Sequence, residues 1–134
     1  MKKTWKILVV DDDRELLKLL REHLKGSEFK ARFAASGAEA LKIAAGPGEI
    51  ELLLTDVLLP DINGIELART MLKRQPGLKI AFMSGYLRPA LTDQENPEST
   101  AKGFIQKPFS GKSLRSFLRD HKDGEGMPSG PAPA

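Results

Sequence analysis

Four short apolar runs in this chain each stop at a residue that can carry charge or donate a hydrogen bond. The runs span residues 7–10, 52–55, 80–83 and 103–106. The residues that follow them are Asp11-Asp12-Asp13, Asp56, Ser84 and Lys107. Helical segments separate the runs, and such alternation is typical of βαβ units in a mostly parallel sheet. Parallel strands end at one edge of the sheet, where open α/β sheets place their sites, so the sequence predicts that these side chains share one crevice.

Helix-starting signals follow the predicted strands. Each is a residue whose side-chain oxygen can accept a hydrogen bond from the first helical turn, and the four are Asp13, Ser36, Asn63 and Ser110. A weaker strand is expected at residues 28–34. Residues 85–102 form the least regular stretch because Pro89 and Pro97 flank a polar segment, so any helix there should be short. The pattern predicts an α/β fold of about five strands and about five helices.

Length and composition limit the other classes of protein. A chain of 134 residues suits one domain with a buried core, and no apolar run approaches the roughly 20 residues that cross a bilayer. The chain has no cysteine, which fits a reducing cytoplasm. Its net charge is +3, but the basic residues are dispersed among acidic ones, which argues against nucleic-acid binding by this domain. We expect a cytoplasmic domain over residues 1–121, without membrane contact, and a flexible Gly/Pro-rich tail or linker over residues 122–134.

The predicted crevice contains the groups that phosphoryl transfer to a carboxylate needs. Such a site requires a nucleophile, a divalent cation and donors aimed at the phosphoryl oxygens. Mg²⁺ prefers one or two carboxylates together with waters and phosphate oxygens, and the acidic residues after the first and third runs suit it. Each piece alone has an ordinary explanation, because an aspartate triplet often serves only as a helix cap with solvated charge. Their arrival at equivalent positions of successive strands favours a common site.

Four segments carry a resemblance to a known family. They are Ile7–Asp13, Leu54–Leu67, Phe82–Tyr86 and Gly103–Phe109. In order and spacing they resemble the receiver domain of two-component signal transduction, the response-regulator family, over about residues 5–121. The resemblance implies a flavodoxin-like, doubly wound, five-stranded parallel sheet with strand order 2-1-3-4-5.

The resemblance also implies roles for the acidic residues. Asp56 would accept a phosphoryl group from a phosphohistidine on a sensor histidine kinase or a histidine phosphotransfer protein, as in a phosphorelay. Asp12 and Asp56 would bind Mg²⁺ directly, Leu58 would add its backbone carbonyl, and Asp11 would act mainly through water. The domain would then be a phosphoacceptor regulator rather than an enzyme, acting on an attached output domain or a downstream protein.

Two further roles concern the response to phosphorylation. Lys107 would pair with the phosphoryl oxygens, and Ser84 would hydrogen-bond to them and pull its loop inward. By analogy with the family, movement of Ser84 would be coupled to the rotamer of Phe104, which stands where many relatives have Tyr. Plain core packing is the equal alternative for Phe104. In the family the peptide corresponding to Lys107-Pro108 is commonly cis, a form that X-Pro bonds tolerate.

Some positions depart from the family pattern. Leu58 and Tyr86 stand two residues after Asp56 and Ser84, where side chains overhang the site in relatives. An apolar and an aromatic group there predict slower attack by water on the phosphoryl group. The Ser84-Gly85-Tyr86 segment, with its irregular continuation, is similar to receivers attached to hybrid sensor kinases.

Two other functions compete with this one. A phosphohydrolase of the haloacid-dehalogenase type would use Asp11 as nucleophile with Asp13 two residues later, but Glu15 stands where that family has Thr or Val. A degenerate receiver acting only as a scaffold is the third hypothesis, and the intact Asp56, Ser84 and Lys107 argue against it. His23 and His121 are interpreted as surface or packing residues.

Overall fold

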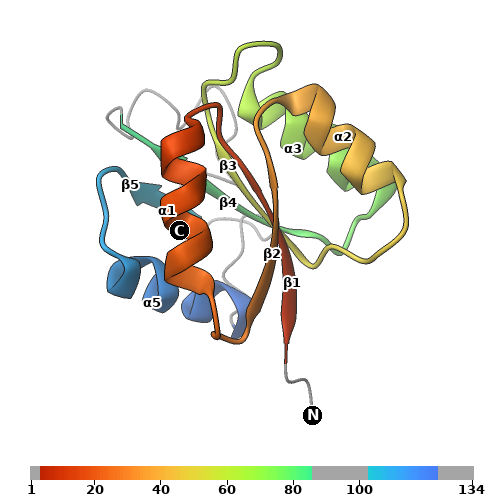
Figure 1. Cartoon of the computed structure of the whole chain (residues 1–134). Helices are drawn as coiled ribbons and strands as arrows, with labels where there is room; N and C mark the ends of the chain where they lie inside the picture. Colours follow the sequence, from red (N-terminus) through yellow and green to blue (C-terminus); the bar gives the residue numbers. More distant parts are fainter. Residues whose placement is uncertain (1–3, 86–102, 124–134) are drawn as a thin grey trace, which may run out of the picture.

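All five strands of the sheet run parallel, in the order β2-β1-β3-β4-β5. Figure 1 shows the sheet together with its helices. The computed structural model describes residues 4–85 and 103–123, the last three of these for the backbone alone. The strands are β1 (Trp5–Val10), β2 (Phe29–Ala34), β3 (Leu52–Asp56), β4 (Lys79–Ser84) and β5 (Phe104–Gln106). The helices are α1 (Arg14–Leu24), α2 (Gly37–Ala45), α3 (Gly64–Arg74) and α5 (Gly111–Asp123). The predicted strand order is confirmed.

The strand bounds differ by one or two residues from those expected from the apolar runs. The strand β1 begins at Trp5 because Trp5 and Lys6 pair with Phe29 and Lys30 of β2. The strands β3 and β4 continue through Asp56 and Ser84, since parallel neighbours extend the ladder beyond the apolar residues. Two of the polar residues expected to follow strands are therefore their last members.

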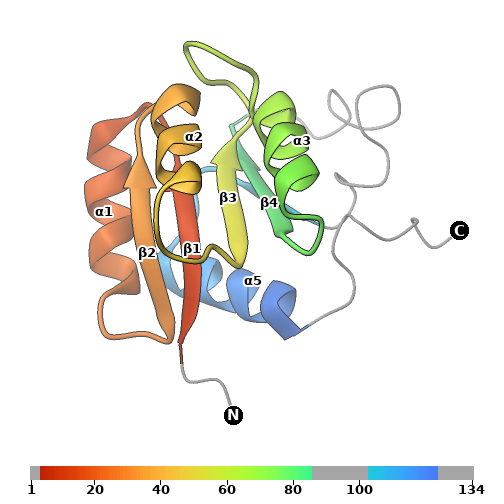
Figure 2. The same ribbon diagram turned by 90° about the vertical axis from the view of Figure 1, so that its right-hand side faces the viewer.

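Alternate residues of the strands pack against helices on opposite faces of the sheet. Ile7 and Val9 of β1 belong to the apolar cluster under α1 and α5, whereas Leu8 and Val10 belong to the cluster under α2 and α3. Figure 2 shows these helices on the two sides of the sheet. Each fully buried leucine of this kind contributes roughly 2 kcal/mol of transfer free energy. The two cores fix the central strands and hence the positions of their carboxyl ends.

The four predicted helix caps are all present. Asp13 and Ser36 accept hydrogen bonds from N–H groups in the first turns of α1 and α2, and Asn63 accepts one from the Ile65 N–H at 2.6 Å. Ser110 accepts the Ser113 N–H at 3.0 Å at the start of α5. These caps satisfy donors that a helix leaves unpaired, and each fixes the residue at which its helix begins.

Some predictions fall on residues that the structure does not describe. The short helix within residues 85–102, the aromatic side chain of Tyr86 and most of the tail at residues 122–134 lie outside the described part of the chain. The described helix α5 continues to Asp123. His23 packs against the start of α5, where a Cβ added to Gly111 would lie 2.5 Å from its Nδ1 atom, in agreement with a packing role.

Candidate functional site

Three aspartates meet at the carboxyl edge of the two central strands. Asp11 and Asp12 follow β1, and Asp56 ends the neighbouring strand β3. One carboxylate oxygen from each lies within 4.8 Å of the others. Asp11 is fully buried, Asp56 is 8% exposed, and Asp12 is exposed to solvent. The predicted acidic cluster is therefore confirmed as a spatial arrangement.

Lys107 reaches this cluster from the far edge of the sheet. Its Nζ atom lies 2.7 Å from Asp11 Oδ2 and 3.1 Å from Asp56 Oδ2. The backbone N–H of Lys107 donates to the Ser84 carbonyl at 2.8 Å, which ties the segment after β5 to the end of β4. The peptide between Lys107 and Pro108 is cis, as the resemblance implied. The ammonium group of Lys107 thus joins Asp11 and Asp56, which lie 96 and 51 positions before it in the sequence.

The remaining hydrogen bonds of the carboxylates differ between the three residues. Asp11 Oδ1 accepts the Asp13 N–H at 2.9 Å, so both oxygens of Asp11 are already hydrogen-bonded. Asp56 Oδ1 accepts the Leu58 N–H at 3.2 Å. The carboxylate of Asp12 accepts no hydrogen bond from any residue in the described ranges. Asp11 and Asp56 thus each accept one loop N–H and one bond from Lys107, whereas the exposed Asp12 has more freedom to bind a cation.

The electrostatics of the cluster favour an additional cation. Burial raises the pKa of the Asp11 carboxyl above its ordinary value, Lys107 and the Asp13 N–H act against this rise, and the charge of Asp56 adds to it. Burial alone would lower the pKa of Lys107, but its hydrogen bonds with Asp11 and Asp56 and their two charges outweigh burial and raise that pKa. With all three carboxylates ionised, one ammonium leaves a net charge of −2. A divalent ion matches that charge, and an all-oxygen donor set is the set that Mg²⁺ prefers.

The other predicted residues lie on β4, on β5 and in the segment after β3. Ser84 ends β4 and is 1% exposed, and Phe104 begins β5 and is packed into the apolar cluster under α2 and α3. The Leu58 side chain is 49% exposed beside Asp56. The predicted role of the Leu58 carbonyl as a ligand stays a prediction, as does the switching role of Phe104.

Two residues near Asp56 have contacts that sequence reasoning missed. The Gly64 N–H donates to the Val57 carbonyl at 2.7 Å, and a Cβ at Gly64 would collide with the Asp56 carbonyl oxygen. Asp61 accepts hydrogen bonds from the N–H groups of Gly37 and Ala38, at 2.9 and 2.8 Å, in the first turn of α2. Gly64 directly follows the Asn63 cap, which is the one sequence signal that pointed to this position. Asp61 carried no signal, because its partners are 23 and 24 residues away.

A family model described as the response regulator receiver domain matches residues 7–119. The chain belongs to this family. The receiver protein CpdR of Brucella abortus is 33% identical over 110 residues, covering 81% of this chain and 89% of CpdR. The sensor kinase CckA of Brucella abortus is 34% identical over 115 residues, covering 85% of this chain and 12% of CckA. The DNA-binding response regulator MtrA of Mycolicibacterium smegmatis is 34% identical over 126 residues, and the chain spans about half of MtrA.

Solved structures of receiver domains share the fold. The response regulator TrrA of Thermotoga maritima, in complex with Mg²⁺ and BeF, has a TM-score of 0.74 and is 28% identical, covering 87% of this chain and 98% of TrrA. A receiver domain of an HD-domain protein from Pseudomonas fluorescens has a TM-score of 0.80 at 22% identity, covering 90% of this chain and 95% of the Pseudomonas chain. The second likeness shows the fold alone.

Membership in the receiver family makes this domain a regulatory phosphoacceptor module rather than an enzyme with turnover of a substrate.

The haloacid-dehalogenase alternative is not favoured. Its nucleophile would be Asp11, but Asp11 is fully buried, which keeps its carboxylate away from a substrate phosphoryl group. None of the helices in the described ranges has the length and apolar character that crossing a bilayer requires.

Proposed function

We propose that Asp56 is the phosphoacceptor of this receiver domain. One of its carboxylate oxygens attacks the phosphorus atom of a partner's phosphohistidine, a P–O bond forms, and the P–N bond breaks so that the imidazole leaves. The product is an acyl phosphate on β3. Asp56 is favoured over Asp12 because Lys107 bonds to its carboxylate, and over Asp11 because Asp56 keeps 8% exposure whereas Asp11 is fully buried.

The observation that carries this proposal is the arrangement of charges around Asp56. One carboxylate oxygen of Asp56 lies within 4.8 Å of oxygens of Asp11 and Asp12, and its Oδ2 lies 3.1 Å from the Lys107 ammonium nitrogen. A phosphoryl group bound to Asp56 would bring further negative charge to this point, so its oxygens need cationic partners. Lys107 is already in place and can shift its hydrogen bond from Asp56 to a phosphoryl oxygen.

The donor set fits Mg²⁺ as the resident cation. Asp12 and Asp56 offer oxygens within 4.8 Å of each other, and Asp11, which is fully buried, is proposed to act through water. The Leu58 backbone carbonyl is proposed as a further ligand. When bound, the ion would offset the charge on the phosphoryl oxygens.

The proposed output is a change of conformation at the end of β4. The Ser84 hydroxyl would hydrogen-bond to the phosphoryl group, and its loop would move toward Asp56. Ser84 is coupled to the segment after β5 through the hydrogen bond from the Lys107 N–H. Phe104 and Phe82 are register partners on β5 and β4 and both lie in the α2/α3 cluster, so a shift at Ser84 can reach Phe104 through packed side chains.

The partners are proposed from the family and from the named relatives. A sensor histidine kinase or a histidine phosphotransfer protein would donate the phosphoryl group in the cytoplasm. The chain spans only 12% of CckA and about half of MtrA, so an attached output domain and its target are part of this proposal. Residues 1–121 would form the receiver and residues 122–134 a linker or tail.

Intact mass spectrometry after incubation with acetyl phosphate and Mg²⁺ tests the acceptor. We expect one added phosphoryl group in the parent and none in Asp56→Asn. The matched control is Asp61→Asn, which removes another carboxylate of the same loop and should still be labelled. Equal labelling of the parent and Asp56→Asn would remove Asp56 from its proposed role.

Leu58 is proposed to shield the phosphoryl group from water because its exposed apolar side chain follows Asp56 by two residues. Leu58→Asn would replace that shield with a side chain that can hydrogen-bond to water. We expect a phosphoryl lifetime shorter by a factor of several, measured as loss of the added mass over time. An unchanged lifetime would contradict the shielding role and leave the acceptor proposal intact.

A further inference from the structure

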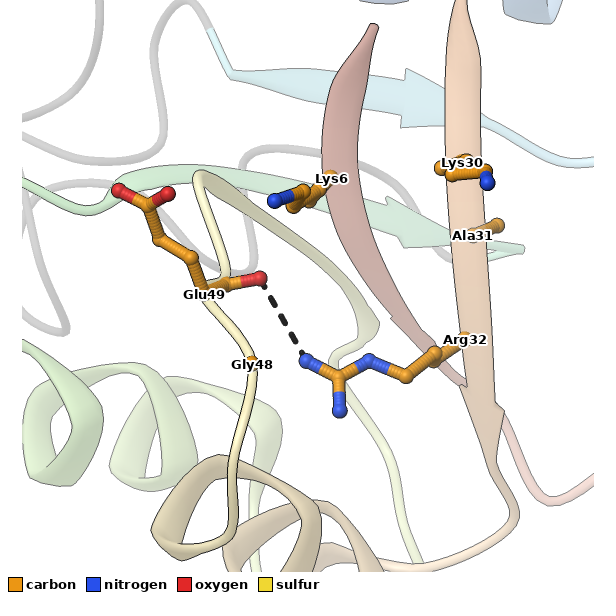
Figure 3. Close-up of a pocket in the computed structure, with 6 residues that line it drawn as sticks. All are labelled: Lys6, Lys30, Ala31, Arg32, Gly48 and Glu49. Carbon is orange, nitrogen blue, oxygen red and sulfur yellow. Dashed lines mark hydrogen bonds between the residues drawn. The ribbon is translucent and has the colours of Figure 1, made fainter.

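A pocket of about 330 Å³ opens away from the acidic cluster, on the part of the sheet where β1 and β2 begin. Figure 3 shows its lining, which comes from two strands and one loop: Lys6, Lys30, Ala31, Arg32, Gly48 and Glu49. We call it the basic pocket. Its size lies at the lower end of the range of small-molecule sites, about 300–1,000 Å³.

The basic pocket exists because α2 covers only part of the sheet face beneath it. Figure 2 shows α2 over the carboxyl-terminal part of β2, with the connection from α2 to β3 crossing the sheet below the helix. Lys6 and Lys30 are register partners on β1 and β2, and Arg32 follows Lys30 by two residues. Side chains two apart on a strand share a face, so the three cations project from the same face of the sheet.

Arg32 is held in place by the loop that crosses the sheet. Its Nη1 donates to the Pro47 carbonyl at 3.3 Å and its Nη2 to the Glu49 carbonyl at 3.4 Å. Gly48 has a φ of +100°, and a Cβ there would lie 3.2 Å from Arg32 Nη2, so glycine lets the backbone lie against the guanidinium. These two bonds use two of the five N–H donors of the group, and the other three are left for a further acceptor.

The cations of the basic pocket lack acidic partners. Within the described ranges no carboxylate forms a salt bridge with Lys6, Lys30 or Arg32. Figure 3 shows the Glu49 carboxylate turned away from the Arg32 guanidinium, which bonds to the Glu49 carbonyl instead. Three positive charges against one negative charge leave the lining with a net charge of +2. Such a pocket attracts an anion of at least two charges.

We propose that the basic pocket is a binding site for a small diphosphate anion. A guanidinium pairs with phosphate oxygens through two parallel N–H bonds, and ammonium groups add point charges, so the three side chains together fit a diphosphate better than a single carboxylate. The charged residues on β2 also discourage pairing of this edge strand with other strands. Edge protection alone accounts for the exposed Lys30, but it gives no reason for a loop that fixes Arg32 beside two further cations.

The test is a titration of the 134-residue protein with inorganic pyrophosphate at constant ionic strength in EDTA, with ¹H–¹⁵N correlation spectra recorded at each step. The chelator removes divalent ions that would carry pyrophosphate to the acidic cluster. We expect saturable shifts centred on the amides of Lys30, Arg32 and Gly48. Lys30→Met, which removes an exposed ammonium group and keeps the apolar stem, should weaken binding by about tenfold.

Two further variants make the result specific. Lys42→Met removes an equal charge from the exposed face of α2, outside the pocket, and should leave the affinity within about twofold, since exposed charges at a distance are screened by salt. Glu49→Gln removes the one negative charge of the lining and should tighten binding by a factor of a few. Equal weakening by Lys30→Met and Lys42→Met, or no saturation below about 10 mM, would overturn the proposal, because only general charge attraction would remain.

The same titration with ADP distinguishes the source of the diphosphate. Tighter binding of ADP than of pyrophosphate would indicate a nucleotide whose organic part contacts the pocket, and equal binding would indicate that the anion alone is recognised. Weaker binding of ADP would mean that the pocket excludes the nucleoside and takes the inorganic anion. Because both arms are run without divalent ions and without a phosphoryl donor, their outcome is independent of the role of Asp56.

Discussion

The acidic cluster and the basic pocket use opposite ends of the same strand in different ways. At the carboxyl end of β1, Asp11 is fully buried and its charge is met by Lys107. At the amino end, Lys6 and Lys30 are exposed and have no carboxylate partner in the described part of the chain. Burying a charge requires a partner because desolvation costs several kcal/mol, whereas an exposed lysine keeps its water. Lys107 is therefore essential to the folded state at the acidic cluster, whereas Lys6 and Lys30 are available to bind a ligand at the basic pocket.

The largest expected effect separates these two kinds of lysine. Lys107→Met leaves the buried Asp11 without its cation, so we expect the free energy of unfolding to fall by about 3 kcal/mol in the absence of divalent ions. Lys30→Met removes an exposed ammonium with no ion pair, and the free energy of unfolding should change by less than about 0.5 kcal/mol. Urea denaturation of both variants in EDTA measures the difference. Similar losses in the two variants would refute the distinction between buried and exposed charge.

Two glycines provide a second contrast between the sites. Gly64→Ala places a Cβ against the Asp56 carbonyl oxygen, which belongs to a buried strand end, and we expect a loss of about 2 kcal/mol in stability. Gly48→Ala places a Cβ against the side chain of Arg32 at a residue whose φ is +100°. We expect this change to lower stability by about 1 kcal/mol, because the exposed loop can relax. Thermal unfolding of the two variants ranks these costs. A reversed order would indicate that the loop beside Arg32 is the more rigid of the two.

Divalent cations should affect only the acidic cluster. At Mg²⁺ concentrations ten times the dissociation constant, binding to the folded state alone adds about 1.4 kcal/mol of stability. Asp12→Asn should reduce this gain, because it removes a carboxylate with no other described partner. Glu49→Gln, in the basic pocket, should preserve it. A melting temperature of the parent that does not respond to Mg²⁺ would contradict the proposed ion site.

The smallest effect concerns pH and the carboxylate of Asp61. Hydrogen bonds from the Ala38 and Gly37 N–H groups lower the pKa of Asp61 from its ordinary value of 3.8. Because the folded pKa is the lower one, the stabilisation is complete above the unfolded pKa and is lost as pH falls through the folded pKa. The parent should therefore lose stability on acidification below about pH 4 more steeply than Asp61→Asn does. Parallel stability profiles for the two proteins would show that Asp61 makes no such contribution.

Much of the fold could be predicted because its signals are local. Apolar runs indicated the central strands, and short polar side chains such as Asp13 and Asn63 indicated the helix starts, since each cap bonds to its own first turn. Strand bounds were less accurate, because Trp5 and Lys6 join β1 through pairing with β2 rather than through their own character. The order of the strands came from the family resemblance.

The acidic cluster was predictable and the basic pocket was not. Parallel strands bring the residues after them to one edge, so Asp56 and Lys107 could be placed together from the order of the runs alone. Lys6 and Arg32 meet because of the register between β1 and β2 and the path of the loop at residues 46–51. In the sequence the basic residues appeared dispersed among acidic ones, and only the structure shows that three of them line one pocket with a single carboxylate, that of Glu49.

Chemical mapping of the phosphorylated residue tests the central claim most directly. Borohydride reduces an acyl phosphate on aspartate to homoserine, which tandem mass spectrometry locates in a peptide. After incubation of the protein with acetyl phosphate and Mg²⁺, we expect homoserine at position 56 alone. Homoserine at position 11, 12 or 61, with none at position 56, would contradict the account.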